Sequence, residues 1–214
     1  MSITLSGVTP IKSGGEKLVF WHPEQPGQLI KLINSRYIQY MNKQWPLMMR
    51  FQRMAHYWSY LRELTEHIAA RAQGVGQLHH LQNITGLVDT DLGLGLVMQA
   101  VLKRNGELAD TLSDVIRKGQ FGSAEAEAFE ALCQWLDETP LIIRDLAAHN
   151  VVWDEVNQHL VIIDGVGGRL RPSVRSLSQR YNRYSNRKKV AKLRLRVQRQ
   201  LASVHVANAE PHTV

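Results

Sequence analysis

The feature that most constrains this chain is a pattern of polar residues around position 150. Arg144 and Asp145 follow a short apolar run, Asn150 lies five residues after Asp145, and Asp164-Gly165 follows two more short apolar runs. Apolar runs of three or four residues that are separated by polar loops predict a small hairpin. Because a hairpin returns the chain on itself, we expect Asn150 and Asp164 to face the same place.

Phosphoryl transfer explains why these residue types would occur at this spacing. The reaction needs a carboxylate that orients the attacking hydroxyl, which Asp145 supplies, and hard oxygen ligands for Mg²⁺, which Asn150 and Asp164 supply. Arg144 would neutralise charge nearby. An Asp, an Asn five residues later and then an Asp-Gly are typical of the catalytic and metal loops of protein kinases. The pattern therefore predicts ATP and Mg²⁺ as cofactors.

Three upstream features occur in the order that a kinase requires. Gly14-Gly15 forms a turn between two expected strands, where backbone N–H groups can approach phosphate oxygens. Lys31 lies inside an apolar strand and is the candidate phosphate-binding lysine. Met98 lies where a kinase connects its lobes and binds adenine. A Gly-Gly turn is often only a turn and a strand lysine usually points to solvent, so the order of these features carries the argument.

The hydrophobic pattern predicts an α+β fold. Strands bounded by Gly and Pro are expected within 3–34 and 83–102. Apolar residues at three- and four-residue steps predict helices over 47–72 and 107–138. The layout is that of two lobes.

Charge is distributed unevenly along the chain. Residues 1–164 hold 14 Lys+Arg and 18 Asp+Glu, a net charge of −4, whereas residues 165–214 hold 12 Lys+Arg and one acid, a net charge of +11. Within the basic tail, Val190, Leu193 and Val197 fall on one side of an expected helix. That side could pack on the protein, or segment 169–201 could contact a membrane surface or glycolipid. Nucleic acid is the partner that the sequence favours least.

Composition excludes several other classes of protein. The 44% hydrophobic fraction excludes a mostly disordered chain, and the single cysteine, Cys133, excludes an intramolecular disulfide. No apolar run is long enough for a membrane span, and no signal peptide is recognisable, so we expect a cytoplasmic protein. The pair His79-His80 lacks a third ligand nearby, which argues against a metal site there.

A set of motifs occurs in a fixed order over residues 3–168. They are Leu5-Ser6 with Pro10, Gly14-Gly15, His22-Pro23-Glu24, Ile30-Lys31-Leu32, Tyr57-Trp58-Ser59-Tyr60-Leu61, the segment 86–97, Arg144-Asp145-Leu146 with Asn150, and Ile163-Asp164-Gly165. On these residues the chain resembles the bacterial PhoP regulatory network YrbL family, a compact branch of the protein-kinase-like superfamily. The resemblance implies a kinase-like fold, with kinases of lipopolysaccharide core sugars as the nearest functional relatives.

The chain departs from the kinase pattern at several positions. Ile143 replaces the His before Arg-Asp, Ala147 replaces a Lys that is common in Ser/Thr kinases, and Val166 replaces the Phe of Asp-Phe-Gly. By the resemblance, the helix glutamate that would pair with Lys31 falls at Met54. Glu63, on the same expected helix, is the candidate substitute, but nine residues are two and a half turns, which turn it to another face, so the partner of Lys31 is either Glu63 or none.

These considerations predict a protein-kinase-like two-lobed fold with a reduced C-terminal lobe and a basic helical tail. The expected division is 1–101, 102–168 and 169–214. Only 50 residues follow Asp164, too few for the platform that docks a peptide, so a non-peptide hydroxyl is the expected acceptor, with a lipopolysaccharide-related sugar as one candidate. The alternative is a pseudokinase or regulatory module whose tail recruits an anionic partner. We also expect a peripheral position at the inner membrane. The sequence leaves the oligomeric state open.

Overall fold

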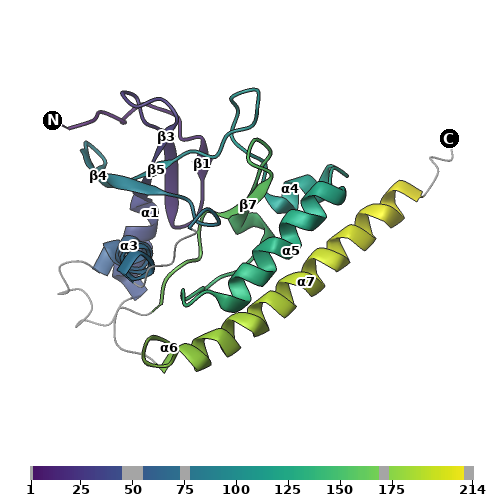
Figure 1. Ribbon diagram of the computed structural model, residues 1–214. Helices are drawn as coiled ribbons and strands as arrows, with labels where there is room; N and C mark the ends of the chain where they lie inside the picture. Colours follow the sequence, from purple (N-terminus) through teal and green to yellow (C-terminus); the bar gives the residue numbers. More distant parts are fainter. Residues whose placement is uncertain (1, 45–54, 73–77, 169–173, 210–214) are drawn as a thin grey trace. The chain divides into compact units, whose positions relative to one another are not determined.

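The computed structural model describes residues 2–44, 55–72, 78–168 and 174–209 (Figure 1). The chain divides into two compact units. The first unit consists of residues 1–64 and 83–100, and the second of residues 65–82 and 101–214. Each unit has its own buried apolar clusters.

The first unit is built on a five-stranded antiparallel sheet in the order β1-β2-β3-β5-β4. At Gly95, a Cβ atom would lie 2.5 Å from Cγ2 of Ile30, so only glycine allows β5 to lie this close to β3. Asp91 closes the β4–β5 hairpin and accepts N–H groups from Leu5 and Ser6. The strands are β1 Lys12–Ser13, β2 Lys17–Trp21, β3 Gln28–Ile33, β4 Ile84–Thr90 and β5 Gly93–Gln99. The expected strand regions are confirmed.

Helices pack on this sheet through a few large side chains. Tyr60 is 1% exposed and its hydroxyl donates to the carbonyl of Lys31 at 2.6 Å. The helix expected over 47–72 is described from residue 55 onward, and Met54 lies outside the described residues. The sequence analysis did not predict α1, a helix without a fully buried residue whose Tyr37 and Ile38 pack half-buried against the core of this unit. The helices are α1 Ser35–Gln44, the 3₁₀ turn Ala55–Tyr57 and α3 Trp58–Ala72.

The second unit packs helices around a short hairpin. Its core includes Leu132, Val151, Leu160 and Leu193, each fully buried. The helix expected over 107–138 is two helices, because Gly119 adopts φ +68°, a left-handed conformation that ends the first one. The elements are α4 Leu112–Arg117, α5 Ser123–Glu138, the 3₁₀ turn Ala148–Asn150, β6 Val151–Asp154, β7 His159–Ile162, α6 Val174–Leu177 and α7 Gln179–Ala209.

The basic tail is largely one helix, α7, and it is part of the second unit. It runs along α5 and also contacts α4 (Figure 1). Val190, Leu193 and Val197 are at most 3% exposed within the core of this unit. The apolar side of the tail therefore packs on the protein, and the side that it leaves to solvent carries many cations and, among its described residues, no acid. None of the helices in the described parts of the chain is long and apolar enough to cross a membrane.

Truncating the buried side of α7 should destabilise the second unit. We expect Leu193→Ala to lower the free energy of unfolding by about 2–5 kcal/mol, because a fully buried leucine leaves a cavity. Leu195 is on the same helix and 47% exposed, so Leu195→Ala should cost less than about 1 kcal/mol. Urea unfolding followed by tryptophan fluorescence measures both variants. Equal losses would show that α7 does not pack as described.

Candidate functional site

A buried carboxylate organises the predicted phosphate-binding region of the first unit. Oε2 of Glu63 lies 3.9 Å from Nζ of Lys31, and Oε1 of Glu63 accepts a hydrogen bond from Nζ of Lys17. The side chains of Lys17, Lys31 and Glu63 are 10%, 7% and 6% exposed. Burial in low dielectric strengthens each attraction, and the pairing offsets the cost of removing these charges from water.

The prediction that Glu63 faces away from Lys31 was therefore wrong. It rested on counting helical turns from Met54, which lies outside the described residues. The described helix α3 begins only at Trp58, after a 3₁₀ turn, and a change from 3₁₀ to α geometry changes which face a later residue occupies. The structure pairs Lys31 with Glu63.

The other predicted residues of this unit lie on the same sheet. Gly14-Gly15 forms the turn between β1 and β2, as expected, and the Gly14 N–H donates to the Lys17 carbonyl at 2.8 Å. No described atom outside the adjacent residues would lie within 4 Å of a Cβ at Gly15, so backbone is exposed there. Met98 is 2% exposed on β5, opposite Leu29. The assignment of Gly14, Gly15 and Met98 to nucleotide binding remains a prediction.

The second unit brings together all four residues of the predicted catalytic and metal loops. The carbonyl of Gly165 accepts N–H groups from Arg144 at 2.7 Å and Asp145 at 3.0 Å. The Asn150 amide donates to both the carbonyl and the carboxylate of Asp145 at 3.3 Å. One carboxylate oxygen of Asp164 accepts the N–H of Gly165 at 2.7 Å. The hairpin β6–β7 thus does what the spacing predicted, because it returns Asp164 to the loop that carries Asp145.

These donor atoms suit a magnesium ion. Asp164 supplies carboxylate oxygen and Asn150 supplies amide oxygen, the hard ligands that Mg²⁺ takes in small number beside water and phosphate. Among the described residues no group of three or more His, Cys, Asp or Glu side chains is arranged to hold a metal. A site that shares its ion with a phosphate ligand fits these residues.

The tail helix holds the backbone that leads into the catalytic loop. Asn182 Nδ2 donates to the carbonyls of Pro140 and Leu141, and Asn186 Nδ2 donates to Leu141 at 2.8 Å. Both asparagines are at most 1% exposed. Since an irregular buried segment must have its carbonyls satisfied by side chains, this pair fixes where the loop starts.

Two further side chains complete this support. The Arg175 guanidinium donates to the side-chain oxygens of Asn182 and Asn186. It also donates to the backbone carbonyl of Ile143 at 3.0 Å. Glu66 accepts the Ile142 N–H at 2.9 Å, and its burial raises its pKa above the usual value. Sequence reasoning missed these residues. The signal was present for the asparagines, because 182 and 186 continue the stripe 190, 193 and 197 at helical spacing.

Three histidines gather in the second unit. The ring centroids of His79 and His80 are 4.1 Å apart, and that of His159 lies within 6 Å of both. Burial lowers the pKa of His80 to about 4, and its Nδ1 lies 2.7 Å from the Leu160 carbonyl. A neutral His80 that donates to this carbonyl is a core residue.

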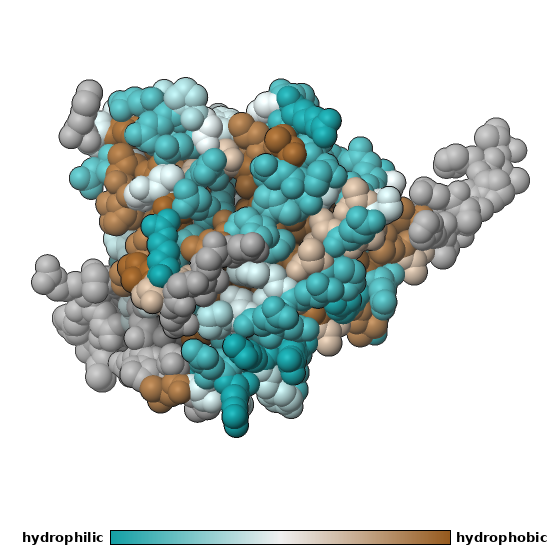
Figure 2. Space-filling view, viewed as in Figure 1, coloured by the Kyte–Doolittle hydropathy of each residue, from teal (hydrophilic) through white to brown (hydrophobic). Residues whose placement is uncertain are grey.

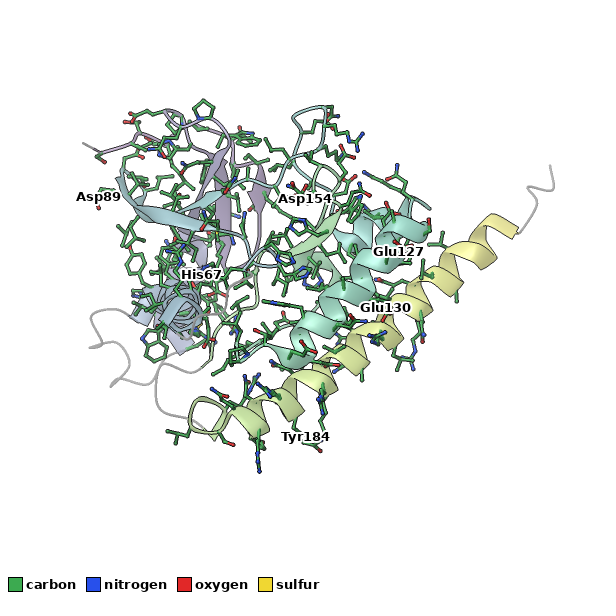
Figure 3. The ribbon with its side chains drawn as sticks, viewed as in Figure 1. His67, Asp89, Glu127, Glu130, Asp154 and Tyr184 are labelled. Atoms are coloured by element: carbon green, nitrogen blue, oxygen red, sulfur yellow. The ribbon has the colours of Figure 1, made fainter. Side chains whose placement is uncertain are left out.

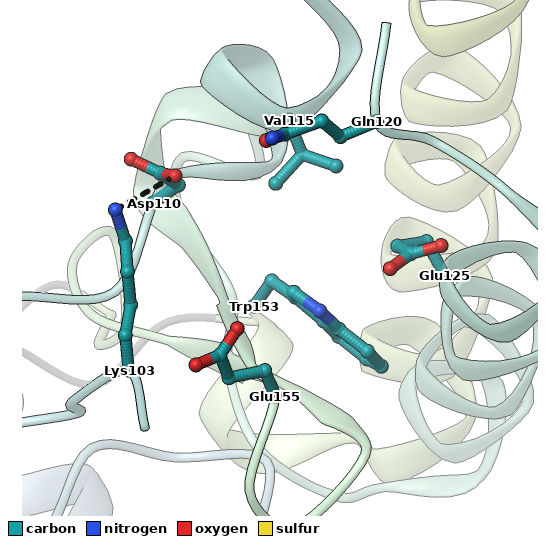
Figure 4. A pocket seen from close by; sticks show the side chains of 7 residues that line it. All are labelled: Lys103, Asp110, Val115, Gln120, Glu125, Trp153 and Glu155. Atoms are coloured by element: carbon teal, nitrogen blue, oxygen red, sulfur yellow. Dashed lines mark ion pairs between the residues drawn. The ribbon is translucent and has the colours of Figure 1, made fainter. Parts of the chain in front are cut away.

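A pocket of about 260 Å³ lies elsewhere in the second unit (Figure 4). An ion pair of 3.1 Å between Lys103 and Asp110 borders it, and Glu155 accepts the backbone N–H of Arg104. None of the predicted phosphotransfer residues lines it. The lining residues are Lys103, Asp110, Val115, Gln120, Glu125, Trp153 and Glu155.

Taken separately, the two units carry the parts of a kinase-like protein. The first has a glycine turn, a strand lysine and a paired helix glutamate, and the second has the loops that the sequence predicts as catalytic and metal loops. The PhoP regulatory network protein YrbL family matches residues 3–198, so the chain belongs to that family.

Other comparisons add little beyond the family. Comparison with curated proteins gives no match. Among solved structures, the chain is similar to the crystal structure of Rad53 1-466 in complex with AMP-PNP, with a TM-score of 0.48 and 12% identity. The similarity covers 87% of this chain and 45% of that one, so this chain matches less than half of that protein's length.

A side chain at Gly165 should destabilise the protein, because this residue contacts the predicted catalytic loop. It adopts φ +85°, and an added Cβ would lie 2.1 Å from the Asp145 carbonyl oxygen. We expect Gly165→Ala to lower the free energy of unfolding by about 3 kcal/mol or more, because backbone strain adds to a backbone clash.

Gly106 provides a matched control for this substitution. It has nearly the same φ, +83°, but no described atom beyond its neighbours lies within 4 Å of an added Cβ. Gly106→Ala should therefore cost only the strain, about 1–2 kcal/mol. Urea unfolding measures both. Equal losses would mean that the contact between Gly165 and Asp145 is not formed.

Proposed function

We propose that this protein binds ATP with Mg²⁺ and transfers the terminal phosphate to a hydroxyl of a non-peptide compound. The observation that carries the proposal is the buried pair of Lys31 and Glu63. In kinases a lysine held by a helix glutamate is the arrangement that contacts nucleotide phosphates. The first unit has it, although the sequence argued against it.

The chain's own residues divide the chemistry between them. Lys31 and the Gly14-Gly15 turn hold phosphate oxygens, and Met98 lies beside the adenine. In the second unit Asp145 orients the acceptor hydroxyl and takes its proton as the hydroxyl oxygen bonds to the terminal phosphorus; the bond to the bridging oxygen breaks, and ADP leaves. Arg144 stabilises negative charge near this loop.

The metal belongs to the same proposal. Asn150 and Asp164 would hold Mg²⁺, which neutralises charge on the phosphates. The hydrogen bonds of Asn150 to Asp145 would keep the metal ligand and the hydroxyl-orienting group in register.

The segment after Asp164 supports a non-peptide acceptor. In protein kinases the activation segment follows the metal loop and ends in Ala-Pro-Glu. Here α7 begins at Gln179, no Ala-Pro-Glu occurs over 165–178, and the first turns of α7 already support the catalytic loop. A small hydroxyl compound is easier to accommodate than a peptide, and a lipopolysaccharide-related sugar is our first candidate.

A pseudokinase or regulatory module remains the alternative function. Val166 in place of the Phe of Asp-Phe-Gly favours it. The carboxylate of Asp145 favours the enzyme, because a protein that only binds nucleotide needs no group to orient an acceptor hydroxyl.

Asp145→Asn separates binding from turnover. We expect it to lower ADP release from MgATP, with water as the acceptor, at least 100-fold, because the variant cannot accept a proton. The affinity for ATP, measured by calorimetry, should stay within about threefold. Asp89→Asn alters an exposed carboxylate on β4 and should leave both quantities unchanged. Absence of nucleotide binding by the natural protein would overturn the proposal, and binding without turnover would favour the pseudokinase.

We further propose that the protein is cytoplasmic and that α7 contacts the anionic surface of the inner membrane. Its exposed side shows hydrophilic residues (Figure 2), and Tyr184 points outward from it with Lys188 over its ring at 4.5 Å (Figure 3). Since the apolar side is buried, attraction would be electrostatic, up to about 1 kcal/mol per cation. The exposed cations are Arg180, Arg183, Arg187, Lys188, Lys192, Arg196 and Arg199.

Vesicle sedimentation tests this contact. Replacing Lys188, Lys192 and Arg199 by Gln should weaken binding to vesicles of 30% phosphatidylglycerol at least 10-fold. Arg117→Gln, at a side chain 76% exposed on α4, should change it less than twofold. Retained binding by the triple variant would contradict the proposal, as would a preference for RNA over these vesicles at equal salt.

A further inference from the structure

Two lysines, rather than one, meet the helix glutamate of the first unit. Val19 lies opposite Lys31 in the β2–β3 pair, and Lys17 lies opposite Ile33. Because alternate residues of a strand share a face, both lysines project from the same face of the sheet, as diagonal neighbours. Each binds a different oxygen of Glu63.

Lys17 is also tied to the glycine turn through its backbone. Its carbonyl accepts the Gly14 N–H at 2.8 Å, and Gly14 in turn accepts from the side chain of Asn34 at 3.2 Å. The Asn34 N–H donates to the Glu16 carbonyl at 2.9 Å. One residue therefore connects the turn proposed to cover phosphates with the carboxylate that holds Lys31.

We propose that Lys17 is a second phosphate-binding lysine. This inference rests on the proposed nucleotide binding and adds a residue to it. The Glu63 carboxylate fixes both ammonium groups before any ligand arrives, so little side-chain entropy is lost when a phosphate binds. A hydrogen bond between an ammonium and a phosphate is charge-assisted and is among the stronger ones.

The consequence is selectivity for phosphorylated nucleotides. Two fixed cations attract the charged phosphates of ADP and ATP but not the uncharged hydroxyl that adenosine has in their place. The affinity should therefore rise steeply from adenosine to ADP to ATP. With Lys31 replaced, Lys17 should still maintain part of this preference. A lysine that only supported Glu63 would act through Lys31, so once Lys31 is replaced it would no longer change the ratio between ligands.

Calorimetry with adenosine, ADP and ATP in the presence of Mg²⁺ tests the inference. Lys17→Met should lower the preference for ATP over adenosine at least 10-fold and leave the adenosine affinity within about twofold. Lys17→Arg should restore most of it. Lys12→Met, at an exposed lysine of neighbouring β1, should leave the preference unchanged. The double variant at Lys17 and Lys31 should show no preference.

The outcomes separate the two proposals. If the natural protein binds ATP and Lys17→Met keeps its preference, or weakens adenosine and ATP equally, Lys17 is structural and this inference fails while the proposed function stands. If the natural protein binds no nucleotide, the proposed function itself fails, and the role of Lys17 fails with it. Circular dichroism shows whether each variant is folded, and Lys17→Arg retains the test if Lys17→Met is not.

Discussion

The carbonyl of Gly165 is the contact that joins the two predicted loops of the second unit. It accepts two consecutive N–H groups, from Arg144 and Asp145, so that the catalytic loop and the metal loop cannot move independently. The approach is so close that a Cβ at this position would overlap the Asp145 carbonyl. A positive φ and this contact both require glycine, which explains physically why Gly must follow Asp164. The next residue, Val166, is buried in the core of this unit and forms an isolated bridge to Ile143.

Support for this arrangement comes from the tail. In α7 the same stripe that buries Val190, Leu193 and Val197 continues toward the start of the helix as two asparagines. Their amides satisfy the carbonyls of residues 140 and 141, where no strand partner does so. Glu130 of α5 pairs with Arg194 on the flank of the same helix (Figure 3). The inner side of α7 thus completes the core of the second unit, and its outer side carries positive charge.

The Glu63 carboxylate plays the corresponding part in the first unit. It lies on α3 and receives two lysines from two adjacent strands, so it connects helix and sheet through charges rather than apolar contacts. Buried charges are costly unless they are paired, which makes such a cluster more informative about function than a buried leucine. The glycine turn, the two lysines and the helix glutamate, all within the first unit, give the nucleotide proposal its physical basis.

The sequence by itself determined the strands, the hairpin that returns Asp164 toward Asp145, and the helical tail, because these follow from local periodicity and from spacing within about twenty residues. It also placed Lys31 on a buried strand. It could not place Glu63, since the facing of a helix depends on where that helix begins and on how it packs, and neither is local. It gave no account of Asn182 and Asn186, whose partners lie about 40 residues away. Only the tertiary structure decided these contacts, because a buried polar group acquires its meaning from the partner that packing brings to it.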